Sequence, residues 1–182
     1  MRAMPLMPQR SDWTVDDLDD LPDDGLQYEL ADGLLLVTPS PRPRHQRMSV
    51  RLTVALAAAC PEHLEVFAAP FDFRPSRVTS LQPDLMVVRR VDVDDEGLTG
   101  TPLLVVEILS PSTRAKDLVL KRALYAEAGV PAYWVLDPVE ATVLVLALED
   151  GAYVEQGRAA GEAQVAVSAP YPLGLRPSDL LR

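Results

Sequence analysis

Residues 103–109 constrain the possible folds of this chain more than any other segment. They are apolar except for Glu107, which is typical of a strand that is covered on both faces. A helical pattern follows at residues 113–128, and a second apolar strand pattern follows at residues 132–136. Because a strand–helix–strand crossover of this length joins parallel neighbours, the pattern predicts an α/β fold.

The other patterned segments predict a mixed central sheet flanked by helices, an α/β or α+β architecture with an N-terminal hairpin. Residues 14–20 are predicted as a short acidic helix, and residues 45–60 as a long helix with one apolar stripe. Asp32-Gly33 predicts the tight turn of the hairpin. The other strands are predicted at residues 26–31, 34–38, 64–68, 71–74, 85–89, 143–148, 152–155 and 164–167, with a loop at residues 92–97.

Length and composition predict one domain over residues 1–182, with a core at about residues 14–175. A chain of 182 residues with 48% hydrophobic residues suffices for one substantial core. The longest apolar run, residues 54–60, is far shorter than a membrane span, and the amino terminus lacks the apolar core of a signal peptide. Cys60 is the only cysteine, which excludes an internal disulfide and a cysteine metal cluster. We therefore expect a cytoplasmic protein.

The charge distribution separates an acidic region from a basic one. The net charge of −10 argues against a protein that coats polyanions in general, because phosphate binding draws on clustered Lys and Arg. Nine carboxylates and no basic residue lie between Asp12 and Asp32. The basic cluster that follows contains Arg42, Arg44, His45, Arg47 and Arg51. It predicts either a patch that contacts nucleic-acid phosphates or ordinary solvated surface charge.

Asp84 and Glu107 are candidate metal ligands. A buried Glu107 would cost several kcal/mol unless a cation, a buried basic partner or access to water at the strand end compensates its charge. Asp84 precedes the predicted strand at residues 85–89, where an aspartate alone often serves only a turn. On neighbouring strands, Asp84, Glu107 and the main-chain carbonyl of Ile108 form an oxygen site suited to Mg²⁺ or Mn²⁺. Such a site indicates phosphoryl chemistry.

Lys121 is the candidate catalytic amine. It lies on the apolar face of the predicted helix 113–128, and a helix folded back on the sheet returns its ammonium to the level of Glu107. The alternative is a lysine at the edge of this face with its ammonium in water. Glu29 is interpreted as a third carboxylate of the site or as an exposed strand residue. His45 is interpreted as a base or phosphate contact, with a surface position favoured, and Asp117 as a partner of Lys121.

Several short motifs follow one another in a characteristic order. They are Tyr28-Glu29-Leu30 with Asp32-Gly33, Ser40-Pro41 with His45, Gln82-Pro83-Asp84, the run from Val106 to Thr113, then Asp117, Lys121 and Tyr125, and the run from Tyr133 to Pro138. In this order and spacing they resemble the Uma family of candidate restriction endonucleases over about residues 15–175. The resemblance implies a restriction-endonuclease-like, PD-(D/E)XK nuclease fold in which Asp84 and Glu107 bind the metal ion.

The lysine of that superfamily usually follows the second acid by two residues, where this chain has Leu109. The resemblance implies that Lys121 replaces it, with Lys116 as the competitor. The expected function is metal-dependent cleavage of phosphodiester bonds in DNA, with a homodimer expected by analogy with double-strand cutters. Two alternatives stay open, because a fold alone does not determine function: a binding or assembly module, and a hydrolase of small phosphoesters.

Overall fold

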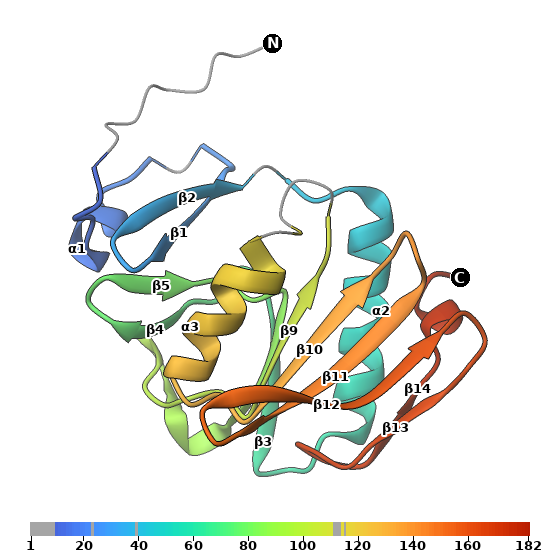
Figure 1. The fold of residues 1–182 in the computed structure, drawn as a ribbon. Coiled ribbons are helices and arrows are strands. Elements are labelled where there is room, and N and C mark those ends of the chain that lie inside the picture. The colour runs from blue at the N-terminus through green and yellow to red at the C-terminus, as the bar shows by residue number, and fades with distance from the viewer. Residues whose placement is uncertain (1–9, 23, 39, 111–113, 115) are drawn as a thin grey trace.

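The central layer of the fold is a six-stranded mixed sheet (Figure 1). This computed structural model describes residues 10–182 except 23, 39, 111–113 and 115, and for residues 116 and 117 it describes the backbone alone. The strand order is β12 (Ala152–Ala160), β11 (Thr142–Glu149), β10 (Ala132–Asp137), β9 (Leu104–Ile108), β6 (Leu85–Arg89) and β3 (Leu64–Ala68). β9 and β10 are parallel, and the other neighbours are antiparallel. The predicted crossover and mixed sheet are confirmed.

Apolar layers cover both faces of this sheet. The long helix α2 (Pro43–Ala59) packs on one face through Met48, Leu52 and Leu56, which belong to the same core cluster as Val106 and Ile108 of β9. The same cluster includes residues of β13 (Val165–Val167), β14 (Leu173–Leu175) and the 3-10 helix η3 (Pro177–Leu180). In the described residues, no helix has both the length and the apolar character needed to cross a membrane.

The opposite face of the sheet is covered by α3 (Arg122–Glu127), which is amber in Figure 1. Its residue Tyr125 packs with Val105 of β9 and Tyr133 of β10 in a second core cluster. Successive side chains of a strand point to opposite faces. Because Val106 and Ile108 pack with α2, Glu107 must point to the α3 face.

A smaller four-stranded sheet lies beside this core. Its order is β2 (Leu34–Thr38), β1 (Gln27–Ala31), β5 (Thr79–Leu81) and β4 (Phe73–Ser76). Asp32 and Gly33 have φ angles of 51° and 77°, as the predicted tight turn requires. The short helix α1 (Val15–Asp19) starts with a capping box between Thr14 and Asp17. The predicted hairpin and acidic helix are thus confirmed.

Several predictions about single elements were incomplete or wrong. The strand predicted at residues 164–167 pairs with β14 in a separate two-stranded sheet, and β4 belongs to the smaller sheet. The predicted loop at residues 92–97 contains the hairpin β7 (Val93–Asp94) and β8 (Gly97–Leu98), after the 3-10 helix η1 (Arg90–Asp92). The helix predicted at residues 113–128 is a π-helix, η2 (Lys116–Lys121), that continues into α3, and residues 113 and 115 lie outside the described part.

Replacing Gly33 with Ala is expected to destabilise the hairpin that carries Glu29. Gly33 has φ +77°, and a Cβ there would lie 2.6 Å from the main-chain oxygen of Ser11. Left-handed backbone costs an L-residue about 1–2 kcal/mol, and the close approach to Ser11 adds to that cost. Gly25 is the matched control, because it has φ +80° but an added Cβ meets nothing within 4 Å. Urea unfolding should show a larger loss for Gly33→Ala than for Gly25→Ala, and equal losses would contradict this packing.

Candidate active site

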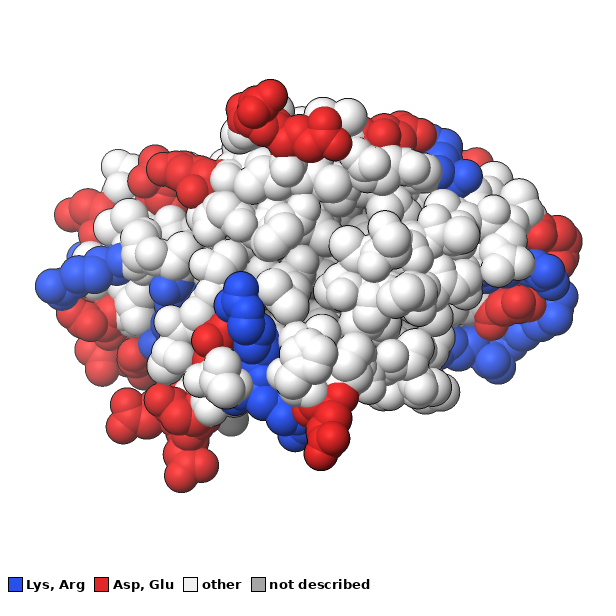
Figure 2. Space-filling view, turned by 90° about the horizontal axis from the view of Figure 1, so that it is seen from below, with Lys and Arg blue, Asp and Glu red and all other residues white. Residues whose placement is uncertain are grey.

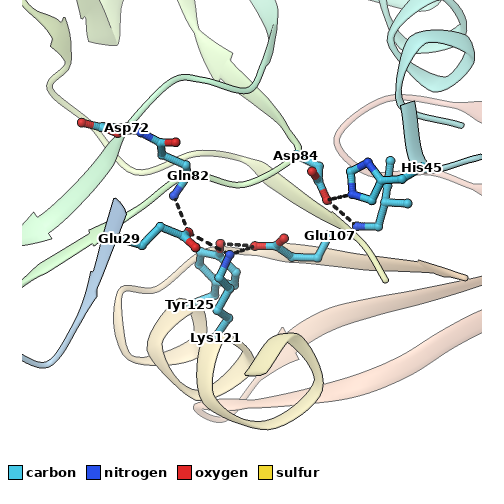
Figure 3. A network of polar contacts seen from close by, with 9 residues as sticks. Glu29, His45, Asp72, Gln82, Asp84, Glu107, Lys121 and Tyr125 are labelled. Atoms are coloured by element: carbon cyan, nitrogen blue, oxygen red, sulfur yellow. Dashed lines mark hydrogen bonds and ion pairs between the residues drawn. The ribbon is translucent and has the colours of Figure 1, made fainter. Parts of the chain in front are cut away.

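A buried lysine between two carboxylates joins three separate elements of the fold (Figure 3). Lys121 Nζ lies 2.8 Å from Glu29 Oε1 and 3.1 Å from Glu107 Oε1. Glu29 comes from β1, Glu107 from β9 and Lys121 from the last residue of η2. Their exposed fractions are 4%, 3% and 5%, respectively. Glu29 is therefore not an exposed strand residue, and Lys121 is the buried basic partner that Glu107 requires.

Tyr125 adds a hydroxyl group to the same cluster. Its hydroxyl donates to Glu107 Oε1 at 2.6 Å. Burial, and then the charges of Glu107 and Glu29, raise the pKa of Tyr125 well above its ordinary value, so the phenol stays a neutral donor. Lys121 and Tyr125 reach one carboxylate because residues four apart share a helix face. Sequence reasoning named Tyr125 as part of a motif and missed this contact, although a hydroxyl on the helix face opposite a buried acid was a usable signal.

Asp84 lies at the point where β6 begins beside the end of β9. Its Oδ2 accepts a hydrogen bond from the main-chain N–H of Ile108 at 2.7 Å and lies 3.2 Å from His45 Nε2. β6 and β9 are antiparallel neighbours with Leu85 opposite Val106. The prediction that Asp84 and Glu107 come from neighbouring strands is confirmed.

The surface position favoured for His45 was wrong. His45 is 9% exposed and points from the first turns of α2 to the Asp84 carboxylate (Figure 3). Its neighbours Arg44 and Gln46 are exposed, so the helix turns His45 inward while it turns the adjacent residues outward. A lone histidine near a predicted helix start gives no sign of this, because the contact depends on a residue 39 positions away.

These groups line one cavity of about 640 Å³ between the hairpin, the start of α2 and the ends of β6 and β9. The charged or titratable residues among its lining are Glu29, Arg42, His45, Asp84, Glu107 and Lys121. Three carboxylates thus face an arginine and a lysine, together with a histidine. Without the histidine, three negative and two positive charges sum to −1, which favours the entry of a cation together with an anionic substrate.

The donor atoms of the cavity fit a hard divalent cation that keeps several waters. Mg²⁺ is commonly held by one or two carboxylates with waters and substrate phosphate oxygens. Both described hydrogen bonds of the Asp84 side chain end on Oδ2, which leaves Oδ1 without a described partner. Ile108 lines the same cavity. Among the described residues, no group of three or more His, Cys, Asp and Glu side chains could hold a metal ion, so a closed cage of protein ligands is not what this site offers.

The basic cluster lies along α2 and reaches the cavity through Arg42. Arg42, Arg44, Arg47 and Arg51 are all exposed. None of the four forms an ion pair within the described part of the chain, whereas every other described arginine except Arg122 pairs with Asp or Glu. In a protein with a net charge of −10, four such guanidinium groups along one helix and its N-cap, with Arg42 on the cavity wall, suit the binding of phosphate.

Figure 2 shows the molecule from below, with uncharged residues over most of the centre and charged side chains gathered towards the margin. The side chains of Lys116 and Asp117 lie outside the described part, so the competitor lysine and the predicted pair of Asp117 with Lys121 stay predictions.

Comparison with known proteins identifies the family. Residues 15–180 match the model of the Uma2 family, whose description is "Putative restriction endonuclease". A crystal structure from Anabaena variabilis, described as "a putative nuclease belonging to DUF820", is similar with a TM-score of 0.71 and 22% identity, over 93% of this chain and 97% of that one. No curated protein matches the chain. The structural likeness confirms the predicted nuclease fold, and the match over most of the sequence shows that the chain belongs to the Uma2 family.

Proposed function

We propose that this protein is a Mg²⁺- or Mn²⁺-dependent endonuclease that hydrolyses phosphodiester bonds in DNA. The observation that carries the proposal is the buried Glu29–Lys121–Glu107 cluster in a cavity that also contains Asp84. Burying three charges is costly, and such costs are concentrated at functional sites. The family and the nuclease fold support the same class of reaction.

Asp84, Glu107 and the main-chain carbonyl of Ile108 are the groups that we assign to the metal ion. When bound, the ion supplies Lewis-acid polarisation of the phosphodiester and lowers the pKa of a coordinated water. His45 and the Ile108 N–H orient the Asp84 carboxylate, and Tyr125 orients that of Glu107. Such outer contacts determine how well ligands are placed for a metal.

Lys121 is assigned as the catalytic amine. Its ammonium has three N–H donors and lies beside Glu107 on the cavity wall. We infer that Lys121 orients the attacking water and stabilises the negative charge that develops on the phosphate oxygens. Glu29 Oε1 pairs with the same ammonium. This contact keeps Lys121 in place when Glu107 also binds the metal ion.

The exposed arginines Arg42, Arg44 and Arg47 are assigned to backbone phosphates of the DNA. Contacts of this kind position the strand and carry no sequence information. His45, which was expected to bind substrate with them, contacts Asp84 instead. We therefore assign His45 to the support of the metal ligand.

The volume of the cavity favours one alternative function. About 640 Å³ lies within the range of small-molecule sites, which suits a hydrolase of small phosphoesters. A panel of supercoiled plasmid, single-stranded DNA, RNA and nitrophenyl phosphates, each with Mn²⁺, separates these functions. Cleavage of DNA supports the proposal, cleavage of nitrophenyl phosphates alone supports the alternative, and no hydrolysis supports a binding or assembly module.

Replacing either assigned metal-ligand side chain should strongly lower cleavage, whereas replacing an exposed acid should leave the cleavage rate unchanged. We expect Asp84→Asn and Glu107→Gln to lower Mn²⁺-dependent cleavage by about 10²-fold or more, because each removes a charged ligand from the reacting centre. Asp95→Asn and Glu127→Gln are matched controls, since both residues are exposed. Full activity in Glu107→Gln would refute the assignment of this site.

Lys121→Met should lose cleavage but gain a larger stabilisation by Mn²⁺ than the wild type. The variant leaves Glu29 and Glu107 buried without the ammonium, at a cost of about 3–5 kcal/mol, and a bound cation offsets part of that cost. Thermal unfolding with and without Mn²⁺ measures the effect. Lys116→Met is the control, and it should retain activity. Retained cleavage in Lys121→Met with loss in Lys116→Met would transfer the catalytic role to Lys116.

The arginine patch should determine the salt dependence of DNA binding. Replacing Arg42, Arg44 and Arg47 together with Ala should weaken binding and reduce the slope of log Kd against log salt by about 0.9 per lost phosphate contact. Binding is measured in the Glu107→Gln background, which prevents cleavage. Alanine at Arg158, Arg176 and Arg182 gives the same change of charge at residues that pair with acids. The same slope in both triple variants would remove the patch from the interface.

A further inference from the structure

The carboxylate of Glu29 is held by a residue outside the proposed catalytic set. The main-chain N–H of Gln82 donates to Glu29 Oε1 at 2.8 Å, and the same oxygen lies 2.8 Å from Lys121 Nζ. Gln82 lies in the link between β5 and β6, two residues before Asp84. The location of Glu29, and through it that of the Lys121 ammonium, therefore depends on the location of the Gln82 backbone.

The side chain of Gln82 anchors that backbone. Its Nε2 donates to Asp72 Oδ1 at 2.8 Å (Figure 3). Because a carboxylate only accepts hydrogen bonds, the amide nitrogen must face Asp72. The amide oxygen is then buried without a hydrogen-bond partner among the described residues. An unpaired buried acceptor costs about 1–3 kcal/mol, so an apolar residue of similar shape would suit this position better if packing were its role.

Asp72 is in turn held by an ion pair with Arg74. Its Oδ2 accepts from Arg74 Nη2 at 2.7 Å, and Arg74 Nη2 also donates to Asp19 Oδ1 of α1 at 2.8 Å. The pKa of Arg74 is raised above its ordinary value, and the hydrogen bond to Asp19 is the largest cause. A continuous series of polar contacts thus runs from α1 to Lys121.

We propose that Gln82, anchored by Asp72, is a positioning residue that sets the location of the Lys121 ammonium through Glu29. This inference rests on the proposed function, in which Lys121 acts on the attacking water. A displacement of about 1 Å at a catalytic group can lower the rate by about 10²-fold. Gln82 acts on this cluster through Glu29, whereas the described hydrogen bonds of the Asp84 and Glu107 side chains go to other residues. We therefore expect its replacement to affect the amine more than the affinity for the metal ion.

The test compares Gln82→Met with Gln156→Met. Gln156 Nε2 also donates to a carboxylate, Glu149 Oε1 at 2.6 Å, but at an exposed position. Gln82→Met should lower kcat for Mn²⁺-dependent DNA cleavage about tenfold or more, with KM and the calorimetric affinity for Mn²⁺ changed by less than about twofold. Gln156→Met should change none of the three quantities.

Two variants of Asp72 provide a conservative rescue. Asp72→Asn keeps an oxygen that accepts from the Gln82 amide and should retain the wild-type rate. Asp72→Leu removes that oxygen and should match Gln82→Met. If Gln82→Met fails to fold, as judged by circular dichroism, the difference between the two Asp72 variants gives the answer, and equal rates for them would count against the inference.

A second measurement does not require cleavage. Lys121 is 5% exposed, so acetic anhydride should modify it slowly, and mass spectrometry reports the rate. Gln82→Met should accelerate this modification, whereas Gln156→Met should not. An unchanged kcat together with unchanged Lys121 acetylation would overturn the inference. If the wild type cleaves none of the substrate panel, the proposed function fails, and the acetylation rates still decide whether Gln82 positions the amine.

Discussion

The burial of one ammonium group between two carboxylates is the interaction on which this site depends. These groups come from three separate elements. Lys121 belongs to the helix η2, Glu29 to β1 of the smaller sheet and Glu107 to β9 of the central sheet. Because an isolated buried charge is far more costly than a paired one, each of the three groups keeps the other two in place. The cluster therefore locks the hairpin, the central sheet and the helix η2 into one arrangement, and it leaves the cavity with more negative than positive charge.

The helices on the two faces of the central sheet contact the two acids, Glu107 and Asp84, from opposite sides. Alternation along β9 turns Glu107 towards α3, where Lys121 and Tyr125 meet it. Asp84 precedes β6, and His45 reaches it from α2 on the other layer. The two carboxylates are thus held from opposite layers and open into the same cavity. This arrangement accounts for two acids that are held by opposite layers and yet face a common space.

Local patterns predicted the parts of the fold and site that depend on neighbouring residues. The apolar run around Glu107, the turn at Asp32-Gly33 and the inward face of Lys121 are all visible in short stretches of sequence. The burial of Glu29 was not predictable in this way, because it depends on the pairing of β1 with β5, some 50 residues later. The contacts of His45 with Asp84 and of Gln82 with Glu29 are likewise long-range. The strand β5 has three residues, too few for a periodic signal, and the π-helical geometry of η2 has no sequence pattern in this chain.

The most direct test of the central claim is the anomalous scattering from a crystal of the wild-type protein soaked with Mn²⁺. The proposed site predicts a peak at about 2.0–2.2 Å from a carboxylate oxygen of Asp84 and one of Glu107, with the Ile108 carbonyl beside it and Lys121 still bound to Glu29. Well-diffracting crystals at high Mn²⁺ with no peak between these two acids, or with a peak at another place alone, would contradict the assignment of this cavity as a metal-dependent nuclease site.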